Sequence, residues 1–536
     1  MRAEQVLSRS RSLVDGLTSN TRRIWWTSFV LLTLLTGLWV VANPLYAGPD
    51  EPAHVIKAVA LDHGQLTGEK LSPRLRELYR NERQDFLMVR VPAVYGIASG
   101  STCFAYNPNS TAECLRFTGS TRETNDATYV ARHPPAYYAV VGIASWIGRP
   151  GSGTVYLMRF ITALITSALI ATAITALGRS TAPKVVAVGV AFAITPMVLF
   201  VNSLVNPSGP EIAGAVAVWV CGLVLISRAH ERIDNWLVTG VGVAGCVMAL
   251  SRQLAPLWLG LIGLTLLAVA NREAIRNLVR SNWARLWGLL IVACSLAQVG
   301  WNAVVGSLEV TREGRPPMHE EASAIVRIVT GRTFFRYHEM IGVFGWGDTP
   351  TPALTWIPWT AGIVFLLFAA VLWVSRRHLL ALAALFAAVI VVPIVIESRT
   401  YNEGGGVNWQ GRYTLPLAVG IPILAAVALA STERGRQLVN SKFLLGVGVV
   451  IGVAHVLAFA QNLRRYAVGY DGAFQFWKHP SWAPPVSSLL LTIAYVIAVG
   501  TFMIWVLSAV PGSDDRVQAD VDVGSVEAPE PAVKPA

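Results

Sequence analysis

Apolar segments of roughly twenty residues recur from Trp25 to Leu507, and this is the length of helix that crosses a bilayer. We expect about twelve helical spans of this kind, at residues 25–46, 155–178, 185–205, 209–227, 236–251, 254–270, 286–305, 353–374, 379–396, 413–430, 443–461 and 487–509. The pattern therefore predicts an all-α, polytopic membrane protein whose membrane domain covers residues 25–509.

Both ends of the chain differ from this apolar pattern. Residues 1–24 carry several arginines and are expected to form a cytoplasmic N-terminal segment. Residues 510–536 are rich in Asp, Glu, Pro and Val and have no hydrophobic periodicity. Such a composition cannot bury enough apolar surface to fold, so we expect a disordered cytoplasmic tail.

Composition and charge exclude a soluble globular protein. Only 14% of the residues are charged, whereas soluble domains carry about a quarter. The net charge of +11 reflects topology, because Lys and Arg gather on cytoplasmic loops. With the expected spans, the loops on one side hold Arg22, Arg23, Arg179, Lys184, Arg228, Arg232, Arg376 and Arg377. This distribution places both termini in the cytoplasm and the protein in the plasma (inner) membrane, and no nucleic-acid-binding motif is present.

The outer loops hold most of the polar residues, and the first of them is the longest, at residues 47–154. Within it, residues 136–148 are apolar but too short to span, so we expect a helix lying at the membrane surface. Cys103 and Cys114 also lie in this loop, while the other three cysteines lie in apolar segments. A loop that faces an oxidising compartment favours a disulfide between Cys103 and Cys114.

The strongest candidate for chemistry follows the first span, in the string Pro-Asp-Glu-Pro-Ala-His at residues 49–54. Asp50 and Glu51 emerge side by side from the membrane, and partial burial there raises a carboxyl pKa and makes a usable general base. His54 follows within the same string and is a candidate substrate contact. The alternative is structural, because Asp50 before a Glu-Pro helix start is also a typical N-cap.

Two further outer clusters are candidates for substrate binding. Arg132 and His133 precede a Pro-Pro helix start and suit contacts to a phosphate or a sugar. Asn206 and Glu211 lie in the turn between the third and fourth spans, and a carboxylate at the mouth of a span is unusual. The alternative for Glu211 is compensation of the helix dipole.

Arginines supply the remaining candidates. Arg252 lies at membrane depth between two short spans, where it would line a wet cavity or form a structural ion pair. Arg399 and Arg412 flank the fourth outer loop, with Gln410 beside the second of them. A guanidinium fork suits phosphate oxygens, although Arg412 at a helix end would also be explained by snorkelling.

Several common catalytic motifs are missing from the sequence. It has no HExxH, no CxxC pair, no Walker loop and no GxSxG elbow, and its histidines are scattered. No metal site and no cofactor are therefore predicted, and dependence on a divalent metal stays open.

The order of these motifs resembles the GT-C superfamily of polytopic glycosyltransferases, which use polyprenyl-phosphate sugars. More closely, the chain is similar to a bacterial membrane family catalogued as domain of unknown function 2142. The carriers of the likeness are residues 49–54, Asn206-Pro207, Ser251-Arg252-Gln253, Phe344-Gly345-Trp346, residues 410–413 and residues 464–466. The resemblance implies a GT-C-like fold and an acidic base at Asp50, with Glu51 beside it. At the turn where the superfamily often has a second acid, this chain has Asn206.

Three functions follow from these observations. The first is a glycosyltransferase that moves a sugar from a polyprenyl-phosphate donor to an envelope glycan, lipid or protein at the outer face. Asp50 would take the acceptor proton, and arginines would hold the departing phosphate. The second is a transporter or flippase of a lipid-linked intermediate, and the third is a non-catalytic envelope-assembly protein. The expected partners are the lipid bilayer, a lipid-linked sugar and an envelope glycan, lipid or protein acceptor, and no nucleic acid is expected.

Overall fold

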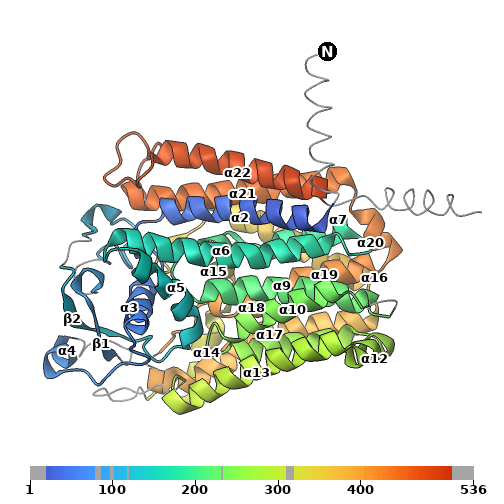
Figure 1. Cartoon of the computed structure of the whole chain (residues 1–536). Helices are drawn as coiled ribbons and strands as arrows, with labels where there is room; N and C mark the ends of the chain where they lie inside the picture. The colour runs from blue at the N-terminus through green and yellow to red at the C-terminus, as the bar shows by residue number, and fades with distance from the viewer. Residues whose placement is uncertain are drawn as a thin grey trace, which may run out of the picture.

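The protein is described by a computed structural model that covers residues 20–78, 86–96, 102–116, 120–230, 233–308, 319–404 and 406–509. The expected segments 1–24 and 510–536 therefore lie almost wholly outside the described residues. Within these ranges the chain is mainly α-helical, with long helices running alongside one another (Figure 1).

Eight helices in the described residues are long and apolar enough to cross a membrane. They are α2 (Thr21–Ala42), α6 (Ser152–Leu177), α9 (Ser208–Arg228), α13 (Asn282–Val305), α16 (Ala353–Trp373), α17 (Arg376–Gly404), α21 (Ser441–Val468) and α22 (Ser488–Ala509). On α13, large apolar side chains such as Leu289 and Leu296 are exposed, as expected for a helix facing lipid. The prediction of an all-α polytopic membrane protein is confirmed.

A ninth candidate span is broken into two helices. α7 (Pro183–Ala193) and α8 (Pro196–Asn202) meet at an angle of 65°. Proline at position 196 has no N–H to donate and disfavours the α conformation in the residue before it. Thr195 is accordingly extended, with φ −69° and ψ 162°, and the helix restarts at Pro196.

The remaining apolar helices are shorter. They are α5 (Pro135–Ile147), α10 (Asn235–Ala249), α11 (Ala255–Val269), and α18 (Leu415–Ala418) followed by α19 (Gly420–Ala430). Every predicted span overlaps a helix, but α10, α11 and the α18–α19 pair fall short of spanning length. The predicted number of about twelve spans is thus not confirmed.

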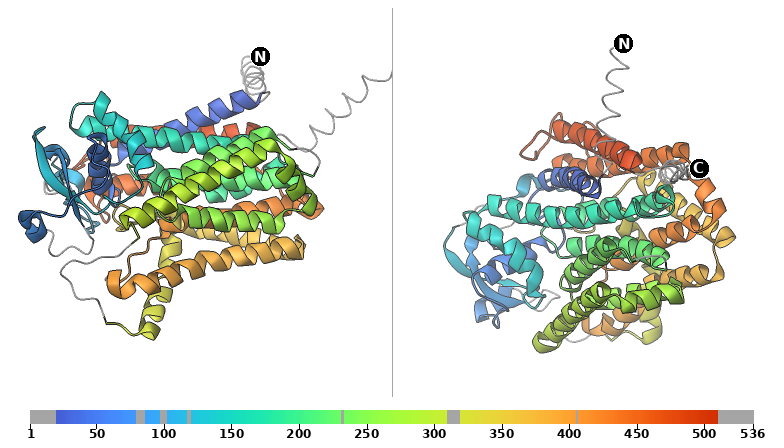
Figure 2. Two further views of the ribbon diagram at one scale, coloured as in Figure 1. Left: turned by 60° about the horizontal axis from the view of Figure 1, so that its bottom comes forward. Right: turned by 45° about the vertical axis from the view of Figure 1, so that its right-hand side comes forward.

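Short elements gather at one end of the bundle, which we call the loop end (Figure 1). It carries α3 (Glu51–Asp62), α4 (Pro73–Leu78), α5, and strands β1 (Leu87–Pro92) and β2 (Glu123–Thr128). The strands pair antiparallel, from Leu87 opposite Thr128 to Pro92 opposite Glu123. Further views show the same elements at this end of the long helices (Figure 2).

Other short elements connect the spans. They are η1 (Ala93–Tyr95), η3 (Ala112–Cys114), α12 (Arg272–Arg280), α14 (Ala322–Gly331), α15 (Thr333–Gly342), β3 (Val343–Phe344), β4 (Thr349–Pro350), η4 (Gly411–Tyr413) and α20 (Glu433–Leu438). β3 and β4 pair with each other as a small antiparallel ribbon.

The core is built around α9. All of its residues from Ser208 to Leu225 are buried, and it packs against α6, α10 and α19. The helix has polar residues only near its two ends, so its first turn brings Ser208 and Glu211 into a buried position at the loop end. The fold therefore places polar groups at the start of the most buried of the long apolar helices described.

Candidate functional site

Asp50 occupies the N-cap position of α3, but its side chain does not cap the helix. The backbone is left-handed there, with φ 68°, a region that few non-glycine residues adopt. The carboxylate instead accepts a hydrogen bond from Tyr129 Oη at 2.6 Å through Oδ1, and pairs with Arg412 through Oδ2. Its side chain keeps 18% exposure, so the group is held in place and is still accessible.

Glu51 has a different environment. Its side chain is fully buried, and Arg159 of α6 donates to both of its oxygens, at 2.7 and 2.6 Å. Oε1 also accepts the backbone N–H of Val205 at 3.0 Å. Arg159 donates in addition to the carbonyls of Asn43 and Pro44, at 2.9 and 2.8 Å. This network joins α6 to the end of α2, to the start of α3 and to the segment between α8 and α9.

The Asn206 turn supports the same backbone segment. Asn206 is buried; its Nδ2 donates to the carbonyl of Pro49 at 3.3 Å, and its Oδ1 accepts from the N–H of Ser208 at 2.9 Å. These bonds link the residue before Asp50 to the first turn of α9. In this structure Asn206 thus positions the acidic turn.

Both predicted histidines share one tyrosine. Nδ1 of His54 lies 2.8 Å, and Nδ1 of His133 3.2 Å, from Oη of Tyr138. Burial lowers the pKa of both imidazoles well below the usual value, and the positive charge of Arg252 acts in the same direction. Both rings are therefore neutral at neutral pH and are held beside the arginines.

Two of the predicted arginines meet at one aromatic ring. The guanidinium carbon of Arg252 lies 4.4 Å from the centre of the Tyr413 ring, and that of Arg412 lies 4.9 Å from it. Arg252 Nη1 also donates to Ser208 Oγ at the start of α9. The cluster thus brings two guanidinium groups together beside Asp50, and guanidinium groups suit an anionic ligand.

A polar cavity of about 200 Å³ lies next to this cluster. Its lining combines residues of α9, α11 and α17 with the segment that leads into η4, and includes Glu211, Arg252, Trp258, Glu397, Trp409 and Tyr413. Arg252 and Tyr413 belong both to this lining and to the cluster, so the cavity and the Asp50 cluster adjoin each other.

The remaining predicted site residues, Gln410, Arg132 and Arg399, do not line the 200 Å³ cavity. Gln410 lines a small cavity together with Pro49 and Arg412, so it lies close to the cluster. The carbonyl of Arg132 accepts a hydrogen bond from Trp301 Nε1 at 3.0 Å. Arg399 is exposed on α17 and is not among the residues that line the described cavities.

Sequence reasoning missed three residues of the site. Arg159 has a recognisable signal, because a lone arginine inside an apolar span needs a partner. Tyr129 has none, since it is one polar aromatic residue in a polar loop. Glu339 of α15 accepts the N–H of Gly411 at 2.7 Å, and burial raises its pKa while Arg412 opposes the shift. Only the fold brings Tyr129 and Glu339 to Arg412.

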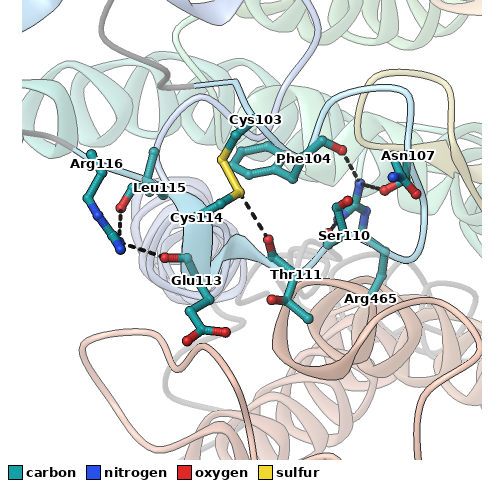
Figure 3. Close-up of a disulfide and its surroundings, with 10 residues drawn as sticks. All are labelled: Cys103, Phe104, Asn107, Ser110, Thr111, Glu113, Cys114, Leu115, Arg116 and Arg465. Atoms are coloured by element: carbon teal, nitrogen blue, oxygen red, sulfur yellow. Dashed lines mark hydrogen bonds between the residues drawn. A yellow bond between two sulfur atoms is a disulfide. The ribbon is translucent and has the colours of Figure 1, made fainter.

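Cys103 and Cys114 form a disulfide with an S–S distance of 1.99 Å. Figure 3 shows the buried Arg465 of α21 reaching into the loop that this bond closes. Arg465 donates to the carbonyls of Phe104 and Ser110, at 2.7 and 2.6 Å, and to Asp348 Oδ2 at 2.8 Å. The loop is therefore fastened to a helix far along the chain.

No group of three or more His, Cys, Asp or Glu side chains within the described residues could hold a metal ion. The chemistry that the described side chains offer is that of a carboxylate and two guanidinium groups, with aromatic rings around them.

The bundle of apolar helices, with its polar loop end, defines a polytopic membrane protein. A model of the family described as predicted membrane protein DUF2142 matches residues 32–421, and the chain belongs to that family, as predicted. No curated protein matches the chain.

Among solved structures, the chain is similar to ArnT from Cupriavidus metallidurans in the apo state, with 13% identity and a TM-score of 0.39 over 94% of this chain and 79% of that one. It is also similar to the same ArnT bound to undecaprenyl phosphate, with 15% identity and a TM-score of 0.40 over 94% and 80% of the two chains.

Proposed function

We propose that the protein is a membrane glycosyltransferase that moves a sugar from a polyprenyl-phosphate donor to a cell-envelope acceptor. One observation carries the proposal: the carboxylate of Asp50 does not cap its helix and pairs with Arg412, which shares the Tyr413 ring with Arg252 of the cavity lining. A base and cations at one accessible point are what transfer from a phosphate leaving group requires.

The reaction follows from these groups. The acceptor hydroxyl attacks the anomeric carbon of the donor sugar, and its proton passes to Asp50. A new C–O bond forms as the bond from the anomeric carbon to the phosphate oxygen breaks. Arg252 and Arg412 stabilise the charge that develops on the departing polyprenyl phosphate. The donor arrives with a good leaving group, so the proposed reaction needs no cofactor.

Arg412 has a second role in this proposal. It is paired with Asp50 in the structure, so one carboxylate oxygen of Asp50 is already occupied. The phosphate of an arriving donor competes for the same guanidinium and draws it away from the carboxylate. Asp50 then keeps the bond from Tyr129 and becomes available to the acceptor proton. The base is thus released only when a donor is present.

Glu51 takes a positioning role in the proposal. Both of its oxygens are already bound by Arg159, and the side chain is fully buried. A substrate could reach it only by breaking that pair, which is costly. We therefore assign the base to Asp50 and the holding of the turn to Glu51 and Arg159.

A large apolar cavity suits the lipid chain of the donor. It has a volume of about 660 Å³ and is lined mainly by apolar residues of α15, α16 and α17, with others from α7, α18 and α19. Thr414, which also lines it, is two residues from Arg412. A phosphate at Arg412 would therefore lie near the mouth of an apolar space.

We also propose that the loop end faces outward and that both termini are cytoplasmic. The Lys and Arg distribution along the loops supports this orientation. The disulfide at the loop end fits an oxidising exterior. The site would then act at the outer face of the plasma membrane.

A gene-deletion experiment tests the proposal. The host lacking the gene is complemented with wild type, Asp50→Asn or Asp471→Asn, and polyprenyl-phosphate sugars and envelope glycans are measured by mass spectrometry. Asp471 is exposed at the loop end, so its substitution serves as a matched control. We expect one lipid-linked sugar to accumulate with Asp50→Asn alone. Full function of a stably inserted Asp50→Asn protein would contradict the assigned base.

Transport of a lipid-linked intermediate is the second candidate, favoured by the broken helix pair α7–α8. Transport should depend on the packing around Thr195 and Pro196 and not on Asp50. Accumulation of the intermediate on the inner leaflet, with Asp50→Asn still active, would support transport.

A further inference from the structure

The 200 Å³ cavity has the size and walls of a site for one small ring. Sites for drug-sized ligands are commonly about 300–1,000 Å³, so this space is too small for a chain of sugars. Trp258, Trp409 and Tyr413 line it. Their rings contact one another edge to face, with Trp409 centred 6.3 Å from Trp258 and 5.8 Å from Tyr413. The cavity therefore has rigid aromatic walls.

These walls are held by buried polar bonds. Glu397 accepts the backbone N–H groups of Asn408 and Trp409 at 2.6 Å each, and its other oxygen is paired with Arg336. Trp409 Nε1 donates to Thr414 Oγ1 at 2.8 Å. The carboxylate of Glu397 is thus used to fix the wall and is not free for a ligand.

Glu211 differs from Glu397 in this respect. It lines the cavity with only 1% of its surface exposed. Its Oε1 is buried and has no hydrogen-bond partner among the described residues. An unpartnered carboxyl oxygen in a buried position lowers stability. A buried polar atom without a partner needs an explanation, and a ligand in the cavity that Glu211 lines would supply the missing partner.

We infer that this cavity binds the single sugar ring of the donor, with Glu211 Oε1 accepting a hydrogen bond from a sugar hydroxyl. The inference rests on the proposed function and adds the place and the groups that select the sugar. A sugar ring has apolar C–H faces that pack on aromatic walls and a rim of hydroxyl donors. The cavity offers both complements, since it combines aromatic side chains with an unpartnered acceptor.

The position of Arg252 gives the orientation of the donor. Arg252 borders the cavity and also contacts Tyr413, against which Arg412 lies. A ring in the cavity therefore directs its phosphate toward the two guanidinium groups. The anomeric carbon, which joins ring and phosphate, then lies on the side of Asp50.

Binding to purified protein in lipid nanodiscs tests the inference. The proteins are wild type, Glu211→Ala, Glu211→Gln and the control Glu433→Ala, whose residue is exposed on α20. The probes are a short-chain polyprenyl phosphate, the same lipid carrying one glucose, mannose, galactose or pentose, and each free monosaccharide. Affinity and the thermal unfolding of the ligand-free protein are both measured.

We expect one sugar-bearing lipid to bind wild type more tightly than the bare lipid. Glu211→Ala should weaken its binding about ten-fold, which corresponds to about 1.4 kcal/mol, and leave bare-lipid binding unchanged. Glu211→Gln keeps an acceptor oxygen and should lose less. Ligand-free Glu211→Ala should unfold at the wild-type temperature or above it, because an unpartnered buried group has been removed.

Four outcomes would overturn the inference. Equal loss of bare and sugar-bearing lipid would assign Glu211 to the phosphate. No gain from any sugar in the panel would remove the ring site. Lower stability of ligand-free Glu211→Ala would make the residue structural. Tight binding of a free monosaccharide, lost in Glu211→Ala, would assign the cavity to the acceptor. Failure of wild type to bind either lipid would instead contradict the proposed function itself.

Discussion

Two adjacent carboxylates begin α3, and each is paired with an arginine from a distant part of the chain. Glu51 binds Arg159 in a fully buried network, whereas Asp50 binds Arg412 and keeps 18% exposure beside a cavity. The first pair also ties three backbone carbonyls and one N–H. The second pair shares its members with Tyr129 and Tyr413. The Glu51–Arg159 pair is therefore placed to stabilise the fold. The Asp50–Arg412 pair consists of the same two chemical groups but lies where a small molecule could reach it.

The largest expected effect is on activity at Asp50. Asp50→Asn keeps the shape of the side chain but removes the base, and loss of a general base lowers rates by about 10²- to 10⁴-fold. Thermal stability should fall less than on breaking the Glu51–Arg159 pair, because the Asp50 side chain does not cap α3 and is partly exposed. Sugar transfer by purified protein and its unfolding temperature are the two measurements. A large loss of stability with a modest loss of activity would mean that Asp50, like Glu51, mainly stabilises the fold.

The buried pair should show the opposite response. Arg159→Met leaves Glu51 buried without a partner, and breaking such a pair costs about 3–5 kcal/mol. We expect poor yield of folded protein and a lowered unfolding temperature. The double variant Arg159→Met with Glu51→Leu should recover much of the stability, since apolar replacement of a buried pair is often tolerated. A stable, inactive Arg159→Met protein would contradict a structural role.

We expect a smaller loss of kcat on substitution of Arg412, and no such loss on substitution of Arg399. Removal of one group that stabilises developing charge costs about 10²-fold in rate, so Arg412→Gln should lower kcat by this order. Arg399→Gln is the matched control, because Arg399 is exposed and lines none of the described cavities. Transfer assays on both variants check this. Equal losses would place the phosphate nearer the fourth loop.

The smallest expected effect is on pH dependence. Burial lowers the pKa of His54 and His133 in the folded protein, so the unfolded chain binds more protons below the usual histidine pKa of about 6.5. Stability should therefore fall as the pH drops below that value, by up to about 1.4 kcal/mol per pH unit for each histidine. Unfolding of wild type and of a His54→Gln, His133→Gln variant between pH 7 and 5 measures it. An unchanged slope in the double variant would exclude these two groups.

Much of the fold could be predicted from the sequence, because apolar length and charge distribution are local signals. Every expected span overlaps a helix, and the string at residues 49–54 does start a helix at the loop end. The count of spans could not be fixed, since short helices such as α10 and α11 have the composition of a span without its length.

The sequence could not separate the roles of Asp50 and Glu51. Their environments differ through Arg159 and Arg412, which lie 108 and 362 positions away. No periodicity of the chain reports such a pairing. Arg252 and Arg412 meet at the Tyr413 ring because the turn before α11 and η4 lie together in the fold. Arg399 is exposed on α17 and lines none of the described cavities.

The fastening of the disulfide loop by Arg465 has a consequence for biogenesis. The bond from Arg465 to the carbonyl of Ser110 closes a separation of 355 residues, and the Asp50–Arg412 pair closes one of 362. During synthesis, the first loop emerges from the ribosome long before its partners exist. The Asp50–Arg412 pair can therefore form only after most of the helices have been synthesised. A chain truncated before α21 would keep this pair but lack the contacts of Arg465 with the disulfide loop.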